Sequence, residues 1–304
     1  MADIERIRDL VNESRDITNS LLPDNQKWNM LCSAMDVIGD TNIGIRTYLE
    51  SSSDGEICYL HIYGLLQVLF VQQDAVKSLA KSLEVELQAN TKLKRIRDIR
   101  NDISGHPTTR CRDKDFIYLS RGAITKTSLT YFKHKSDDNS DEWFDIDING
   151  LIADQNEGIS NWLAKIYSKL SARENTHRQE HRDMKLEDIF HPTLNYLFSK
   201  IYESEYNDNK LGQAKAHLKL IDQMVCQFKE ALIQRGEGHS EWDRDFQRYQ
   251  YGSEKLRKIL FREIELEPIE IEITCSFLQK YVQKFKKGAQ DIDETYSENV
   301  DIQD

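Results

Sequence analysis

The stretch YGLLQVLFVQQDAVKSL, residues 63–79, is so rich in residues of the buried type that it predicts the central helix of a hydrophobic core. The whole chain has 304 residues, of which 39% are hydrophobic and only four are proline. Because proline interrupts helices, so few of them leave room for long helices. We therefore expect a mainly α fold. The expected helices are residues 3–20, 25–50, 56–87, 91–104, 150–184, 186–206, 210–235, 240–264 and 269–287.

One part of the chain departs from the helical pattern. Three segments alternate apolar and polar residues, contain many aromatic residues and are separated by turn-like sequence, which predicts a small antiparallel β-meander. The predicted strands are residues 116–121, 128–135 and 142–147. A polar stretch at residues 171–185 marks the expected boundary between two domains. These are a helical domain at 1–170 with a β insertion at about 115–147, and a second helical domain at 171–304 whose acidic tail is expected to fray from about Gln290.

The composition argues against several classes of protein. No stretch approaches the ~18 apolar residues of a membrane span, and the opening MADIERIRDL carries acids where a signal peptide carries its apolar core. The five cysteines are scattered without a CxxC pair, which argues against disulfides and cysteine zinc sites. There is no glycine-rich phosphate loop or G-x-S-x-G elbow. We expect a cytoplasmic protein that needs no cofactor and does not associate with a membrane.

The charge of the chain is unevenly distributed. The formal net charge is −11, which is unfavourable for a protein that binds a polyanion over its whole surface. Between Thr91 and Lys114, however, eight basic residues face three acidic ones. This basic island in an acidic protein is the more informative feature.

The basic island contains a predicted helix whose arginines lie next to its buried side. On a helix covering residues 91–106, the isoleucines fall within about 60° of arc and mark the buried side. Arg97 and Arg100 border this stripe, where a contact with another helix or subunit would lie. Gly105 is expected to end the helix in the left-handed conformation, so that His106 can fold back toward Arg100.

The run Arg100-Asn101-Asp102-Ile103-Ser104-Gly105-His106 resembles the R-x4–6-H signature of the HEPN superfamily, whose all-helical domains include many metal-independent ribonucleases. In that family a polar residue commonly follows the arginine, as Asn101 does here. The resemblance covers roughly residues 25–170. It implies Arg100, Asn101 and His106 as catalytic residues and a homodimer that brings two such motifs together in one cleft.

The chemistry of RNA cleavage asks for these residue types. The 2′-OH next to the scissile phosphate is the nucleophile, and histidine has a pKa suited to removing its proton or protonating the leaving oxygen. We expect the guanidinium of Arg100 to stabilise charge on the phosphate and the amide of Asn101 to orient the phosphate or the imidazole. No metal is required. The predicted RNA-binding residues are Lys92, Lys94, Arg95, Arg97, Arg110 and Arg112.

By the same resemblance, the predicted function is a metal-independent endoribonuclease, a toxin or antiviral effector restrained by an antitoxin or another regulatory protein. The alternative is a catalytically inactive HEPN-like adaptor that binds a nucleotide or protein partner, in which Arg100 is an ordinary helix-edge charge. A third hypothesis, a zinc hydrolase, rests on His177-Arg178-Gln179-Glu180-His181, which matches the H-x-x-E-H zinc motif. Almost no apolar residues flank it, which favours a solvated helix instead.

Overall fold

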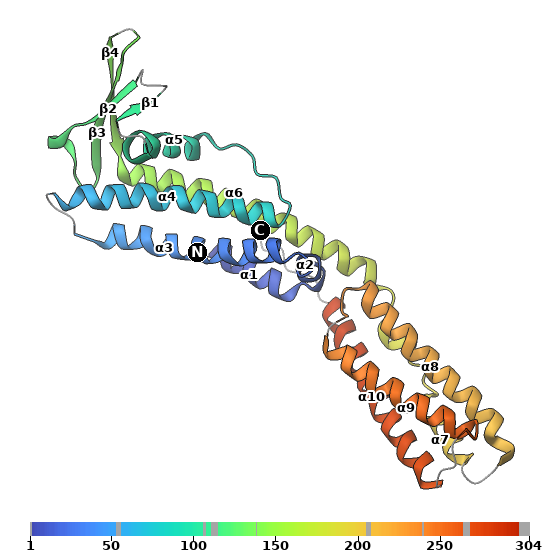
Figure 1. Cartoon of the computed structure of the whole chain (residues 1–304). Coiled ribbons are helices and arrows are strands. Elements are labelled where there is room, and N and C mark those ends of the chain that lie inside the picture. Colours follow the sequence, from blue (N-terminus) through green and yellow to red (C-terminus); the bar gives the residue numbers. More distant parts are fainter. Residues whose placement is uncertain are drawn as a thin grey trace. The chain divides into compact units, whose positions relative to one another are not determined.

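The computed structural model divides into two compact units, unit 1 (Met1–Ser171) and unit 2 (Ala172–Asp304), one residue after the expected boundary. The fold is mainly α with a small antiparallel sheet, which confirms the predicted class (Figure 1). Within the ranges described below, no helix combines the length and apolar character needed to cross a membrane. The structure describes residues 2–52, 56–105, 108–110, 115–137, 139–204, 208–238, 240–263 and 268–297.

The quoted stretch forms most of α4, which packs against α3 in unit 1 (Figure 1). Its leucines are buried in the core, but its two adjacent glutamines are buried as well. Gln73 donates hydrogen bonds to Oε1 of Gln155 (2.8 Å) and to the carbonyl of Leu93 (3.2 Å), and Gln155 donates to Oε1 of Gln72 (2.9 Å). These bonds fix α4 to α5 and α6 at the centre of the unit. The helices of unit 1 are α1 Ala2–Glu13, α2 Arg15–Leu21, α3 Asn25–Glu50, α4 Ile57–Ser82, α5 Thr91–Arg100 and α6 Ile148–Arg182, the last of which extends into unit 2.

The predicted meander forms a sheet of four described strands in the order β1-β2-β3-β4, all antiparallel. Its register places Phe132 opposite both Tyr118 and Trp143. The two-residue strand β1 was not predicted. The strands are β1 Thr109–Arg110, β2 Asp115–Leu119, β3 Ser128–Lys135 and β4 Ser140–Asp147, with a short 3₁₀ helix η2 at Arg121–Ala123.

Two helix boundaries in unit 1 correct the predictions. The helix expected at 3–20 is interrupted at Ser14, whose buried hydroxyl caps α2 by accepting from the N–H of Ile17 at 3.2 Å. The helix expected at 56–87 ends at Ser82. There Glu84 takes a left-handed φ of 57°, and the N–H of Val85 bonds the carbonyl of Ala80, as in a Schellman motif.

Unit 2 has its own core, built around Phe228, Phe246 and Phe285. The fraying expected from about Gln290 is wrong, because α10 continues to Ser297. The helix expected at 186–206 is divided into η3 and α7 around a turn at Pro192. The elements of unit 2 are η3 Leu186–Ile189, α7 Leu194–Glu203, η4 Asp208–Lys210, α8 Leu211–Gln234, α9 Ser240–Leu260 and α10 Pro268–Ser297.

Close packing at Gly158 of α6 gives a stability prediction. A Cβ at Gly158 would lie 2.6 Å from Cγ of Leu93, whose side chain is 1% exposed. Overpacking of this kind costs about 1–3 kcal/mol, and the helix propensity of alanine offsets about 1 kcal/mol of it. We therefore expect Gly158→Ala to lower the free energy of unfolding by about 1 kcal/mol.

The matched control is Gly39→Ala in α3, where a Cβ meets no atom within 4 Å. This variant is expected to raise the free energy of unfolding by about 0.5–1 kcal/mol. Urea unfolding of both proteins measures the difference. A Gly158→Ala protein as stable as the control variant contradicts the packing described here.

Candidate functional site

Helix α5 and the turn after it carry the predicted motif. Asn90 caps the helix, because its side chain accepts a hydrogen bond from the N–H of Leu93 at 3.1 Å. The leucine and isoleucines of α5 are buried, as the predicted stripe requires. After Arg100 the α-helix changes to a π-helical turn, η1, at Asn101–Gly105. Such turns are rare and often occur at functional sites.

The guanidinium of Arg100 is held by three side chains. Its Nε and Nη2 donate to Oε1 of Gln67 at 3.2 and 2.8 Å, and its Nη1 donates to Oδ1 of Asn101 at 3.1 Å. Its Cζ lies 4.1 Å from the centroid of the Phe70 ring. These bonds use three of the five guanidinium N–H groups, and the other two have no partner among the described residues. The arginine is therefore fixed in one orientation with donors still available.

Arg97 makes a similar contact with α4. Its Cζ lies 4.0 Å from the centroid of Phe70, and its Nη1 bonds Oδ1 of Asp74 at 2.6 Å. Partial burial, followed by the positive charge of Arg97, lowers the pKa of Lys77 on the same surface. Gln67, Phe70 and Asp74 were not predicted as site residues. Their spacing of three and four residues, which puts them on one face of α4, is the signal that could have found them.

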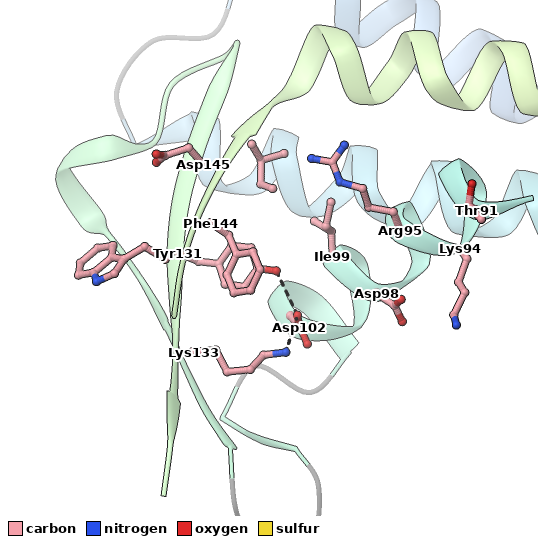
Figure 2. Close-up of a pocket in the computed structure, with 12 residues that line it drawn as sticks. Thr91, Lys94, Arg95, Asp98, Ile99, Asp102, Tyr131, Lys133, Phe144 and Asp145 are labelled. Carbon is pink, nitrogen blue, oxygen red and sulfur yellow. Dashed lines mark hydrogen bonds and ion pairs between the residues drawn. The ribbon is translucent and has the colours of Figure 1, made fainter. Parts of the chain in front are cut away.

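Asp102 connects the motif to the sheet. Its side chain is buried, and its Oδ2 accepts a hydrogen bond from the hydroxyl of Tyr131 at 3.1 Å and pairs with Nζ of Lys133 at 3.3 Å. Both partners lie on β3, so the carboxylate joins η1 to the strand (Figure 2). This role of Asp102 was not predicted, because in the sequence Asp102 stands out only as an acidic residue of the basic island.

Gly105 has a different role from the one predicted. It does not take the left-handed conformation, which among the described glycines only Gly236 takes. Instead, a Cβ at Gly105 would lie 2.8 Å from Nη1 of Arg100, so the absence of a side chain here lets the guanidinium approach the backbone closely. His106, the next residue and the predicted acid–base catalyst, lies outside the described residues.

The basic island is less positive than its sequence indicates. Lys92 pairs with Asp154 (3.0 Å) and Glu157 (2.7 Å) of α6, and Arg95 lies 4.0 Å from Asp154. Lys94 is exposed. The acids that balance this charge come from distant parts of the sequence, which a local count cannot include. Of the other two predicted RNA-binding residues, Arg110 belongs to β1 and Arg112 lies outside the described residues, so the RNA-binding role of the set stays a prediction.

A groove of about 630 Å³ lies between α5 and the sheet (Figure 2). Helix α5 contributes Lys94 and Asp98, β3 contributes Tyr131 and Lys133, and β4 contributes residues 143–146. Its lining combines aromatic rings with both signs of charge. The arginines of α5 that contact α4 are not among the lining residues, so α5 presents two distinct faces.

The histidines of the zinc motif lie in unit 2. The rings of His177 and His181 are 4.8 Å apart, and their centroids lie 5.7 and 6.2 Å from that of Tyr296. Burial, and then the charge of Glu237, raise the pKa of Tyr296. Across the described parts of the chain, no three or more His, Cys, Asp or Glu side chains form a group that could hold a metal ion. The two histidines pack on a tyrosine.

Comparisons with known proteins give no relative for this chain. No model of a protein family matches the sequence, and neither a curated protein nor a solved structure does. The residues around Arg100 are therefore the basis for assigning a function.

Proposed function

We propose that unit 1 is a metal-independent endoribonuclease of the HEPN type. The observation that carries this proposal is the position of Arg100. Its guanidinium is fixed beside Asn101 and packs against Gly105, the residue that directly precedes His106. The side chains of Arg100 and Asn101 are therefore hydrogen-bonded to each other at the end of α5.

The proposed reaction needs no group beyond these side chains and the RNA. A base removes the proton of the 2′-OH, whose oxygen attacks the adjacent phosphorus while the bond to the 5′-oxygen breaks. The products are a 2′,3′-cyclic phosphate and a 5′-hydroxyl. We assign the transfer of protons to His106, whose residue type titrates near neutral pH.

The two available N–H groups of Arg100 suit the phosphate oxygens, on which negative charge accumulates in the transition state. The bonds to Gln67 orient these donors before the substrate binds, so little entropy is lost in ordering them during the reaction. Asn101 accepts from Arg100 through Oδ1, which leaves its amide N–H groups to bond a phosphate oxygen. DNA lacks the 2′-OH and is not a substrate.

We further propose that the enzyme acts as a homodimer in the cytoplasm. One chain supplies one histidine after its motif, whereas the reaction needs a base and an acid, so two motifs facing each other supply both. Regulation by an antitoxin or another protein fits an activity that damages the cell's own RNA. Sedimentation of the wild-type chain over a range of concentrations tests the dimer.

Activity on RNA in excess EDTA tests the proposal. We expect the purified chain to cleave labelled single-stranded RNA but not DNA of the same sequence, and His106→Ala to lower the rate by about 10²–10⁴-fold. The control is His191→Ala, an exposed histidine of unit 2, which is expected to keep the full rate. Cleavage at the same rate by His106→Ala contradicts the proposal. Loss of wild-type activity in EDTA contradicts a metal-independent reaction and makes His177 and His181 the candidates for a metal site.

A second function is favoured by one observation. The three hydrogen bonds of Arg100 and its stacking on Phe70 are also what an arginine needs to fix α5 to α4 in an inactive adaptor. In that case no RNA is cleaved, and Arg100→Ala lowers the stability of unit 1 without any activity to lose.

A further inference from the structure

Strand β4 forms an open edge of the sheet beside the groove. In the strand order β1-β2-β3-β4 it pairs only with β3 among the described strands. The groove of about 630 Å³ runs between this strand and α5. An open edge presents backbone N–H and C=O groups that an incoming extended chain can bond.

The hydrogen-bond pattern identifies the groups at this edge. The N–H of Ile148 bonds the carbonyl of Thr127, so in this antiparallel register the even-numbered residues of β4 bond β3. The odd-numbered residues, among them Asp141, Trp143 and Asp145, therefore direct their N–H and C=O groups to the open side. No bond to these groups occurs within the described parts of the chain.

The same odd-numbered residues place their side chains on the face of the sheet away from α5. Trp143 is 60% exposed there and packs on Phe132 with a centroid distance of 4.7 Å and an angle of 32° between the rings. The exposed carboxylates of Asp141 and Asp145 lie on either side of it, and Figure 2 shows Asp145 on the opposite side of the strand from Tyr131. No lysine or arginine of β2, β3 or β4 projects from this face. His134 lies on this face with its Nδ1 2.8 Å from Oδ1 of Asp141, and Oδ1 of Asp145 accepts a hydrogen bond from the hydroxyl of Thr130 at 2.7 Å. Each carboxylate has further acceptor sites, so the exposed indole between them suits a cationic side chain.

We propose that β4 binds an extended basic peptide by antiparallel strand addition. Alternate side chains of the peptide lie on the outer face, where Arg or Lys contacts Asp141, Trp143 and Asp145. The side chains between them point into the groove toward Tyr131 and Phe144, where short apolar residues fit. This interaction does not depend on whether unit 1 cleaves RNA.

Charge argues against two other occupants. A second copy of β4 would bring four acidic residues opposite four others, because the strand SDEWFDID contains Asp141, Glu142, Asp145 and Asp147. An RNA strand stacked on Trp143 would place its phosphates near the same carboxylates. The groove carries both signs of charge, with Lys94, Arg95 and Lys133 among its lining residues, so the charge argument applies to the outer face of this edge. A peptide with basic side chains on that face and uncharged ones toward the groove complements it.

The probe for this proposal is a fluorescein-labelled peptide of alternating Arg and Val, about as long as β4. We expect saturable binding to the full chain by fluorescence anisotropy and none for the same peptide with Glu in place of Arg. The double variant Asp141→Asn/Asp145→Asn is expected to weaken binding about tenfold, and Asp141→Lys/Asp145→Lys to prefer the Glu peptide. The matched control is Asp40→Asn/Glu50→Gln, which neutralises two exposed acids of α3 and should leave binding unchanged.

Two methylated peptides separate strand addition from simple ion pairing. In an antiparallel addition, the residues that bond the edge of β4 are those with side chains on the outer face, the Arg residues. N-methylation of the Arg residues is therefore expected to abolish binding, whereas N-methylation of the Val residues should preserve it. Equal binding of both methylated peptides overturns strand addition. Equal binding of the Arg and Glu peptides, or binding of single-stranded RNA at this edge that Trp143→Ala abolishes, overturns the proposed partner.

Discussion

Replacing Arg100 with alanine is expected to slow RNA cleavage by about 10²–10³-fold, the loss typical of removing a donor that stabilises charge in a transition state. After its bonds to Gln67 and Asn101, the guanidinium keeps two N–H groups for phosphate oxygens. Arg100→Lys is expected to lose nearly as much. A lysine keeps the charge, but it has no planar fork that bonds Gln67 and a phosphate at the same time. Initial rates on labelled RNA in excess EDTA measure both variants.

Gly105→Ala tests the same guanidinium without replacing it. The added Cβ lies 2.8 Å from Nη1 of Arg100, so the end of the arginine side chain must move. Because misplacing a catalytic group by about 1 Å is costly, we expect a loss of rate of about 10²-fold. Gly64→Ala is the matched control, since a Cβ there meets no atom within 4 Å, and it is expected to keep the full rate.

A folded-state measurement must accompany these rates, because Arg100 also contacts α4. Loss of its stacking on Phe70 and its bond to Gln67 is expected to cost about 1–2 kcal/mol, which leaves most of an ordinary domain's stability in place. Circular dichroism on heating compares each variant with the wild type. An Arg100→Ala protein that stays folded and cleaves RNA at the wild-type rate contradicts the assigned role.

The limits of some helices and strands could be predicted because interactions between residues close in sequence determine them. Helix α3 has the predicted limits, since Asp24 caps its first N–H groups, and β3 has the predicted limits because its alternating pattern is matched by both neighbouring strands. The ends of α4 and α9 were placed too late. They end where Glu84 and Arg262 take left-handed φ values of 57° and 58°, and non-glycine residues in this conformation give little sequence signal.

The candidate site was predictable only in part. The helical period places Arg100 beside the buried stripe, which the structure reproduces on α5. Its partners Gln67 and Phe70 lie about thirty residues away and become neighbours only when α5 packs on α4. Asp102 lies in the π-helical turn and pairs with Lys133 of β3, a contact between residues about thirty positions apart that local propensity does not reveal.

Replacing Asp293 with alanine is expected to lower the free energy of unfolding of unit 2 by about 3–5 kcal/mol, the usual cost of leaving a buried charge unpaired. The side chain of Arg235 is only 3% exposed, and its Nη1 bonds Oδ1 of Asp293 at 3.0 Å. The carboxylate also accepts from the N–H groups of Leu186 and Glu187, at 3.0 and 2.9 Å, and so caps η3. The ion pair and the cap both lie in the part of α10 that was predicted to fray, and they join it to η3 and to the end of α8.

The large cost depends on the arginine that remains, which a second variant tests. In Arg235→Met/Asp293→Leu no charge is left unpaired, so we expect this protein to be more stable than Asp293→Ala although it carries two substitutions. Asp291→Ala, an exposed acid two residues earlier on α10, is the control and should change the free energy of unfolding by less than about 0.5 kcal/mol. Hydrogen-exchange mass spectrometry of α10 peptides assigns the effect to unit 2. If Asp293→Ala exchanges like the control, the buried pair does not stabilise α10.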